Sequence, residues 1–202
     1  MIESSHNVSS KQRLIDATVE LLSRQGYSGT GVNEIARVGQ APMGSFYHHF
    51  PAGKEALAAE ALRAGGAQYA ALIARALARP GTLGDRLAAI ATLTAKHLQR
   101  TAYAQGCPVA TTALETVANS EVLQAEAANA FAMWQSQIDQ AAQSDGWPPS
   151  EAEALAVAAL ALIEGAEMLA RVRRSPAPLA TAAQALRALA AQPFGPAAPQ
   201  RT

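Results

Sequence analysis

Residues 34–57 read EIARVGQAPMGSFYHHFPAGKEAL, the most informative stretch of the chain. Within and around it, two short segments with helical spacing, 31–38 and 43–50, are separated by a turn at 39–42 that contains glycine. Pro42 suits the first turn of a helix, where its missing N–H is not needed. Two short helices at this spacing predict a helix-turn-helix, whose second helix places its N-terminal residues in the major groove of DNA.

Helical patterns continue on both sides of this motif. Ser9 and Gln12 have the spacing of a capping box, and Gly26 is placed to end the helix that starts there. Alanine and leucine are abundant, whereas alternating strand patterns are scarce. The sequence therefore predicts an all-α fold of about nine helices. The six that follow the motif are expected over about 54–78, 83–103, 109–118, 120–145, 150–174 (capped by Ser150) and 179–191.

Composition limits the possible functions. The 202 residues are 50% hydrophobic and carry no net charge, and residues 1–54 hold five Lys and Arg against four Asp and Glu. Charge alone is therefore weak support for DNA binding, and the motif must carry that prediction. Metal-ligand spacings and phosphate loops are not found, so we expect no metal, no cofactor and no enzyme.

Several features indicate a cytoplasmic protein. A lone cysteine, Cys107, excludes an intrachain disulfide and fits a reducing compartment. The first twelve residues lack the basic and apolar regions of a signal peptide. No apolar run reaches the roughly 18 residues that a membrane span needs, so no membrane partner is expected.

The stretch from Tyr27 to Leu57 resembles the DNA-binding domain of the TetR family of transcriptional regulators. The matching marks are Ile35-Ala36, then Gly44-Ser45-Phe46-Tyr47-His48-His49-Phe50, then Lys54-Glu55-Ala56-Leu57. Aromatic and histidine positions in a fixed order over more than twenty residues make this resemblance specific.

The resemblance implies roles by position. Tyr47, His48 and Lys54 would contact DNA phosphates, and Thr30 or Gly31 would cap the first helix of the motif beside the DNA backbone. Phe46 and Phe50 would be core residues. The base edges of DNA would be faced by Pro42, Met43, Gly44 and Ser45. The chain departs from the family pattern at Gly31, Gln40 and Met43, where relatives usually carry Ser or Thr, Gly, and Lys.

The C-terminal part resembles the LmrA/YxaF-type branch of these regulators. The matching segments are Gly53, Gly106-Cys107-Pro108-Val109-Ala110, Ala113-Leu114-Glu115, Ile163-Glu164-Gly165-Ala166, Leu169-Ala170-Arg171, Pro178-Leu179, Ala182-Ala183 and Leu186. This resemblance implies a ligand cavity inside the fourth to eighth helices. Candidate lining residues are Tyr69, His97, Tyr103, Cys107, Phe131, Trp134, Ile138 and Glu164. Glu164 lies in an apolar helix, where it either lines the cavity or pairs with an arginine such as Arg171.

Residues 154–163, ALAVAALALI, are apolar on every face of a helix. Such a helix is buried on all sides, which in so small a domain suggests a place between a core and a second subunit. The next helix offers an apolar stripe of Leu179, Ala183, Leu186 and Ala190. We therefore expect these last two helices, the eighth and ninth, to form an isologous four-helix dimer interface.

Three parts are expected: a DNA-binding domain over 9–54, a ligand-binding and dimerisation domain over 55–192 and a disordered tail over 193–202. Residues 1–8 look like a disordered arm. The predicted function is a homodimeric repressor that a small apolar or aromatic molecule releases from its operator. One alternative is a ligand-binding helical module that no longer binds DNA, and another is an all-helical enzyme.

Overall fold

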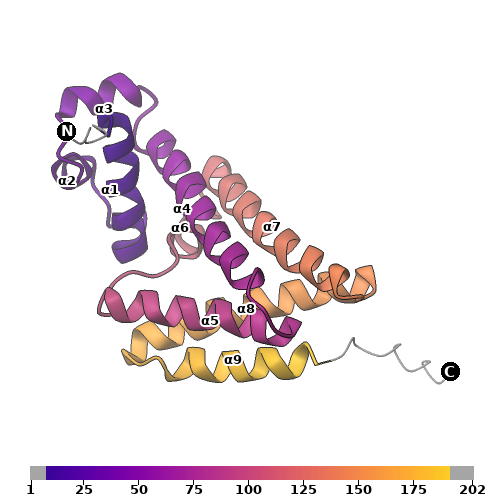
Figure 1. Cartoon of the computed structure of the whole chain (residues 1–202). Helices are drawn as coiled ribbons and strands as arrows, with labels where there is room; N and C mark the ends of the chain where they lie inside the picture. The colour runs from indigo at the N-terminus through magenta and orange to yellow at the C-terminus, as the bar shows by residue number, and fades with distance from the viewer. Residues whose placement is uncertain (1–7, 192–202) are drawn as a thin grey trace, which may run out of the picture. The chain divides into compact units, whose positions relative to one another are not determined.

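The all-α architecture predicted from the sequence is confirmed. The structure, a computed structural model, describes residues 8–191, and this part of the chain folds into nine α-helices without strands. In chain order they are α1 Ser10–Gln25, α2 Val32–Val38, α3 Met43–His49, α4 Lys54–Leu77, α5 Leu83–Arg100, α6 Pro108–Thr116, α7 Glu121–Ser144, α8 Pro149–Arg173 and α9 Ala177–Leu189 (Figure 1). Among these helices, none is long and apolar enough to cross a membrane.

Local chemistry explains the ends of α1. The Ser9 hydroxyl accepts a hydrogen bond from the backbone N–H of Gln12 (3.2 Å), as the capping-box spacing predicted. The Gln12 side chain donates to Asp16 instead of reaching back to Ser9, so the box is only half formed. Gly26 follows the helix with a φ of 71°, which confirms it as the residue that ends α1.

Several predicted helix ends were wrong by a few residues. Pro42 precedes α3 instead of lying in its first turn. Helix α8 begins at Pro149, so Ser150 lies inside the helix and is not its cap. The end of α5 falls at Arg100 instead of Tyr103, because Ala102 and Tyr103 adopt left-handed φ values of 49° and 63°. The predicted arm over 1–8, apart from Val8, and the predicted tail over 193–202 lie outside the described residues.

Two compact units make up the chain. The first contains residues 1–68 and 105–130, and the second contains 69–104 and 131–202. Helices α4 and α7 therefore each contribute to both units. The functional boundary predicted from the sequence coincides with the start of α4, whereas the two compact units divide within α4. The functional boundary therefore stays a prediction.

An apolar cluster of buried residues holds the helix-turn-helix part of the first unit together. It joins the inner faces of α1, α2 and α3 to the start of α4 (Figure 1). The Phe46 and Phe50 rings, both buried, stack with their centroids 6.2 Å apart. Burying a Phe or Leu side chain stabilises the folded state by about 1.5–3 kcal/mol. The cluster contains Leu14, Ile15, Ala17, Leu21, Ile35, Ala41, Phe46, Phe50 and Leu57.

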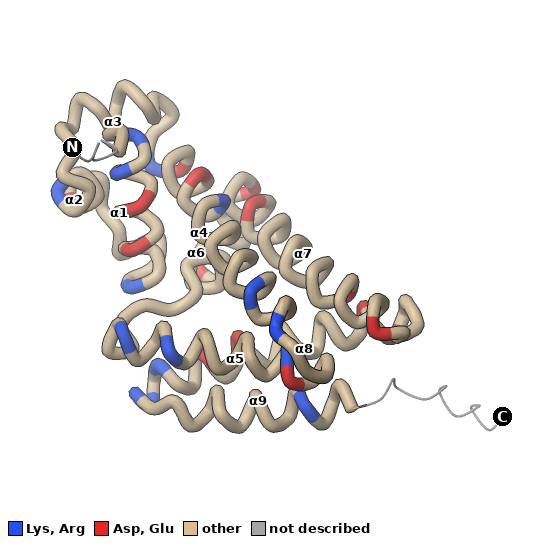
Figure 2. The backbone as a smooth tube through the Cα atoms, viewed as in Figure 1, with Lys and Arg blue, Asp and Glu red and all other residues tan. Residues whose placement is uncertain are grey.

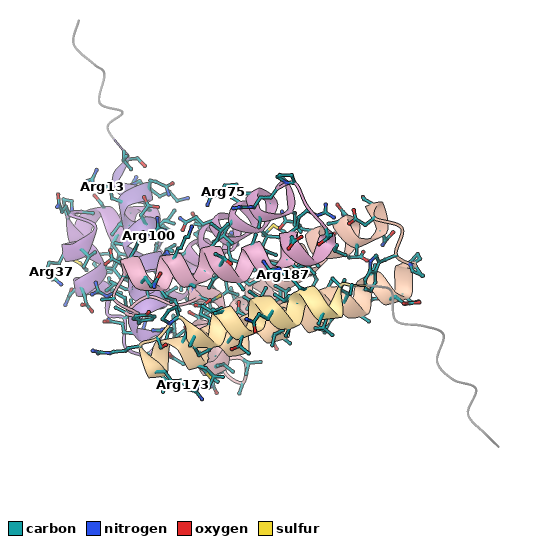
Figure 3. The ribbon with its side chains drawn as sticks, turned by 60° about the horizontal axis from the view of Figure 1, so that its bottom comes forward. Arg13, Arg37, Arg75, Arg100, Arg173 and Arg187 are labelled. Atoms are coloured by element: carbon teal, nitrogen blue, oxygen red, sulfur yellow. The ribbon has the colours of Figure 1, made fainter. Side chains whose placement is uncertain are left out.

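In the second unit, α5, α8 and α9 pack side by side (Figure 1). Leu179, Ala183, Leu186 and Ala190 of α9 are buried there, within a single chain, because α9 packs against α5 and α8. The expectation that this stripe faces a second subunit was therefore wrong. At the margin of the contact, Arg187 of α9 (labelled in Figure 3) donates to Asp85. The two atoms are 2.9 Å apart, and this exposed pair contributes little to stability.

Burial divides α8 into two faces, whereas the sequence predicted burial on every side. One face, which includes Leu155, Ala159 and Ile163, lies in the core of the second unit. The opposite face stays accessible within the chain and is apolar, with the half-buried Glu164 at its edge. Its members, at helical spacing, are Ala154, Val157, Ala158, Ala161, Gly165, Met168, Leu169 and Val172.

Candidate nucleic-acid interface

The turn between α2 and α3 has the geometry of a helix-turn-helix. Gly39 ends α2, and Gln40 then takes a left-handed φ of 49°. The chain folds back at once, because the N–H of Ala41 donates to the carbonyl of Ala36 (3.0 Å). A left-handed conformation strains a non-glycine residue, which explains why relatives usually carry glycine where this chain has Gln40.

Arg13 of α1 holds the turn between α2 and α3 by hydrogen bonds to its carbonyl groups, a role that sequence reasoning missed. Its Nε donates to the carbonyl of Gly39 (3.1 Å) and its Nη2 to that of Gln40 (3.3 Å). A third bond, from Nη1, reaches the carbonyl of Val8 (2.7 Å). One guanidinium thus satisfies carbonyls that the tight turn leaves free. No local pattern could have revealed it, because the partners are 26 or 27 residues away.

Helix α3 has one buried and one exposed face. Phe46 and the residue that ends the helix, Phe50, point into the core, whereas Tyr47 keeps 64% of its surface exposed. His48 is exposed as well, as are Pro42 and Gly44, while Met43 and Ser45 are half-buried. His49 and Ser10 share a hydrogen bond (3.1 Å) that ties α3 to the start of α1. The predicted base-facing residues therefore lie together at the accessible start of α3.

Gly44 is not required by the packing of the protein itself. A Cβ atom built at this position would meet nothing within 4 Å. Gly31, which precedes α2, is equally open, and its residue type supplies no side-chain cap. Both glycines leave the surface of the motif bare, so another molecule can approach the backbone closely there.

Two of the predicted phosphate-contacting or capping residues are engaged inside the protein. Thr30 is only 1% exposed, and its hydroxyl donates to the carbonyl of Gly26 (2.6 Å), so it does not cap α2. Lys54 donates to the carbonyl of Tyr27 (2.7 Å), and its ammonium lies 4.0 Å from the centre of the Tyr27 ring. Burial lowers the pKa of Lys54 and raises that of Tyr27. The predicted phosphate contact of Lys54 would have to use its remaining N–H groups.

Helix α3 carries no Lys, Arg, Asp or Glu, as Figure 2 shows by its uniform tan colour. The exposed cation nearest in sequence is Arg37 of α2, whose side chain is 75% exposed and projects from the helix-turn-helix (Figure 3). Glu34 lies 3.8 Å from it, a weak surface contact. The surface of α3 is therefore suited to contacts through hydroxyl, imidazole and backbone groups more than to bulk charge attraction.

Three of the eight predicted effector-binding residues form an aromatic cluster in the second unit. The Tyr69 ring lies 4.7 Å from that of Trp134, and Phe131 contacts Trp134 edge-on with centroids 5.0 Å apart. The Tyr69 hydroxyl approaches the Thr94 hydroxyl of α5 (3.4 Å). Nearby on α7, the amide nitrogen of Gln137 donates to the carbonyl of Ala70 (3.3 Å).

The other predicted effector residues are more dispersed. Ile138 is buried one turn after Trp134, and Glu164 is half-buried on α8. His97 is half-buried on α5, where burial, aided by the charge of Arg100, lowers its pKa. Tyr103 is half-buried in the turn after α5. Whether these residues touch an effector stays a prediction.

Cys107 does not lie in the same unit as the other seven. It precedes α6 in the first unit, and its sulfur accepts a hydrogen bond from the N–H of Ala110 (3.4 Å), so its role there is that of a helix cap. Glu167, a carboxylate only 5% exposed on α8, was missed by sequence reasoning, although its position in an apolar helix was a signal. Arg171 donates to the carbonyl of Ala104 (3.1 Å), and both alternatives for Glu164 stay open.

The geometry defines a class of protein, a helix-turn-helix DNA-binding protein with a separate helical unit. Among the described residues, no group of three or more His, Cys, Asp or Glu side chains could hold a metal ion. Comparisons with known proteins agree on the class. The model of bacterial regulatory proteins of the tetR family matches residues 14–61, and the model of the LmrA/YxaF-like C-terminal domain of transcriptional regulators matches 84–185.

Relatives match over most of their length. The transcriptional regulator YxaF of Bacillus subtilis is 31% identical over 84% of this chain and 89% of its own. LmrA of the same organism is 31% identical over 84% of this chain and 90% of its own. The structure of a regulatory protein TetR from Rhodobacter sphaeroides superposes with a TM-score of 0.79 at 28% identity, covering 89% of this chain and 98% of that chain.

The chain therefore belongs to the TetR family of bacterial transcriptional regulators, with a C-terminal domain of the LmrA/YxaF-like type. Its N-terminal helices are the DNA-binding domain of that family. The matching families and relatives are regulators of transcription and not enzymes.

Proposed function

We propose that the protein is a homodimeric repressor that binds an operator through α3 and leaves it when a small apolar or aromatic molecule binds the second unit. The observation that carries the DNA-binding part is the division of α3 into two faces. Phe46 and Phe50 anchor the helix, while Gly44, Tyr47 and His48 form an exposed surface without Lys, Arg, Asp or Glu. Chromosomal DNA as the partner implies action in the cytoplasm.

DNA contacts would divide into two kinds. Pro42, Met43, Gly44 and Ser45, at the start of α3, would face base edges in the major groove, which is how sequence is read. Tyr47 and His48 would donate to phosphates, with Gly31 and Lys54 beside the DNA backbone. Phosphate contacts supply much of the affinity and release counterions, so binding should weaken as salt rises.

Dimerisation would use the exposed apolar face of α8. Val172 is 79% exposed and Met168 59%, although both are large apolar side chains. A Cβ built at Gly165 would meet nothing within 4 Å, so a second helix can approach there closely. Burial of this face against its copy in a second chain would remove it from water. From α9 the interface would take the side opposite to its buried stripe, where Ala180, Thr181, Gln184 and Ala188 are exposed.

The effector would bind at the aromatic cluster of the second unit. Tyr69, Phe131 and Trp134 offer apolar area, and the Tyr69 and Thr94 hydroxyls offer polar groups that orient a ligand. Helix α4, which contributes to both units, would move with the ligand and change the separation of the two recognition helices. The ligand can shift this equilibrium only by its difference in affinity for the two conformations.

Selection from a random library of double-stranded DNA tests the proposal. A symmetric dimer should enrich an inverted repeat whose half-sites are separated by about one helical turn, roughly 34–36 Å, or a related spacing. A library without any enriched sequence would favour a ligand-binding module that no longer binds DNA. Compounds with planar aromatic rings would then be screened for release of the selected DNA, with Tyr69→Phe as a variant that keeps the ring but removes the hydroxyl.

A further inference from the structure

Helix α6 belongs to the same compact unit as the helix-turn-helix, although it lies far from it in sequence. It packs against α1. Just before α6 starts, the N–H of Gly106 donates to the carbonyl of Ser23 in the last turns of α1 (2.9 Å). Val109 and Thr112 are buried. The start of α6 is thus fixed to the C-terminal end of α1.

The far end of α6 reaches the turn that connects α1 to α2, residues 26–29. The Glu115 carboxylate accepts a hydrogen bond from the backbone N–H of Ser28 (2.7 Å). Gly26 makes room for it, because a Cβ at that position would lie 1.6 Å from Oε1 of Glu115. Gly26 also needs its φ of 71°, which L side chains rarely adopt. Glycine therefore both forms the turn and admits the carboxylate.

The same turn is held by two other residues. Thr30 donates its hydroxyl to the carbonyl of Gly26, and Lys54 donates to the carbonyl of Tyr27. Burial lowers the pKa of Lys54, and the negative charge of Glu115 opposes that effect. Glu115, Thr30 and Lys54 bind three of the turn's backbone groups from α6, from the α2 side and from α4. Thr30 and Gly31 follow the turn, and α2 then begins at Val32.

We propose that Glu115 is a positioning residue for DNA binding: it holds the 26–29 turn, and with it the start of α2, in a fixed relation to α6. The effect on DNA affinity rests on the proposed function, whereas the effect on the turn does not. Glu115 itself touches neither bases nor phosphates in this account. It acts through the N–H of Ser28 and the helix that follows.

The path of the chain explains why α6 lies beside the 26–29 turn although the two are far apart in sequence. The chain passes from the second unit to the first between residues 104 and 105, and α6 is the first element after this crossing. Shortly before the crossing, Ala102 and Tyr103 both have left-handed φ values, a strained conformation for non-glycine residues. Only residues 104–107 join Tyr103 to the start of α6 at Pro108.

The sign of the effect separates positioning from simple electrostatics. Removing a negative charge from a DNA-binding unit strengthens DNA binding if charge alone matters. Loss of the hold on the turn weakens it. We expect Glu115→Ala to weaken binding to the selected DNA by roughly 3- to 10-fold, which corresponds to the net contribution of one ordinary hydrogen bond. Glu115→Gln keeps an acceptor oxygen and should recover part of the loss.

The experiment combines DNA titration with amide exchange measured by NMR. We compare wild type with Glu115→Ala, Glu115→Gln and the control Glu121→Gln. Glu121 is an exposed glutamate of the same unit, at the start of α7. Each protein is measured at a temperature equally far below its own thermal midpoint. Faster exchange at Ser28 in Glu115→Ala, together with weaker DNA binding that the control does not show, supports the proposal.

Unchanged exchange at Ser28, or equal or tighter DNA binding by Glu115→Ala, overturns it. If wild-type protein binds no DNA at all, the proposed function fails instead. Exchange at Ser28 then still decides whether Glu115 holds the turn.

Discussion

At the scale of single residues, the exposed surface of α3 is unusual because it carries a glycine, Gly44, in the first turn of the helix. Glycine at position 44 disfavours a helix, and no neighbour in the protein requires it, since a Cβ there would meet nothing within 4 Å. A residue that costs stability without a structural reason is best explained by what approaches from outside. Close contact with base edges supplies such a reason, because a bare backbone lets the helix enter the groove deeply.

Gly44→Ala should therefore separate stability from function. Alanine in a helix is favoured over glycine by about 0.5–1 kcal/mol, so the thermal midpoint should rise by roughly 1–4 °C. DNA affinity should fall, because the added methyl group occupies space at the interface. Differential scanning fluorimetry and DNA titration measure the two effects. Full affinity in the variant would show that Gly44 does not face the DNA.

His97 gives the fold a pH dependence of known sign. Burial, with a smaller contribution from Arg100, lowers the pKa of His97 in the folded state below its ordinary value near 6.5. The unfolded chain then binds more protons than the folded one as the pH falls below about 6.5, so the free energy of unfolding decreases on acidification. His97→Gln should reduce this loss between pH 7.5 and 5.5 in urea unfolding. Parallel pH profiles for the two proteins would contradict the assignment.

Sequence reasoning identified the accessible residues of α3 better than the contacts beneath them. The accessible residues at the start of α3 were found from the family pattern, and Phe46 and Phe50 were correctly placed in the core. The engagement of Thr30 and Lys54 with the 26–29 turn could not be predicted, because a position in a motif does not show which backbone carbonyl lies within reach. The bonds of Arg13 and Glu115 are equally non-local, joining residues up to 87 positions apart.

At the scale of elements, helix positions were predictable and helix faces were not. Periodicity and capping residues placed all nine helices, with errors of a few residues at their ends. The stripe on α9 was correctly identified as apolar, but it packs against α5 and α8 within one chain. Periodicity shows that a face is buried without showing by what. The exposed stripe of α8 became visible only once its opposite face was placed in the core.

This stripe leads to a prediction for assembly. The wild-type protein should sediment as a dimer, at twice the chain mass of 20.9 kDa, at micromolar concentration. Met168→Glu and Val172→Glu place a charge in the proposed interface and should shift the protein towards monomer without unfolding it, because both positions are exposed within the chain. Ala132→Glu, on an exposed side of α7, is the matched control and should remain dimeric. A monomeric wild type in analytical ultracentrifugation would refute this interface.

At the scale of the whole molecule, each compact unit contains helices that are not consecutive in the sequence. The helix-turn-helix shares its compact unit with α6 and the first part of α7, while α4 and α7 continue into the second unit. Sequence reasoning placed α6 in the C-terminal domain, and a linear pattern could not show that this helix also packs against α1. A regulator needs such shared elements, since coupling between a ligand and DNA requires a part of the protein that responds to both.

The most direct test of the central claim is a fluorescence-anisotropy titration of the protein with the DNA that flanks its own gene, at several salt concentrations, with Tyr47→Ala as the control. Tyr47 is 64% exposed, so its loss should leave the fold intact. The account predicts tight binding to a palindromic sequence, weakening steeply as salt rises and much reduced in Tyr47→Ala. Equal binding by the wild type and Tyr47→Ala to any DNA sequence would contradict a sequence-specific interface on α3.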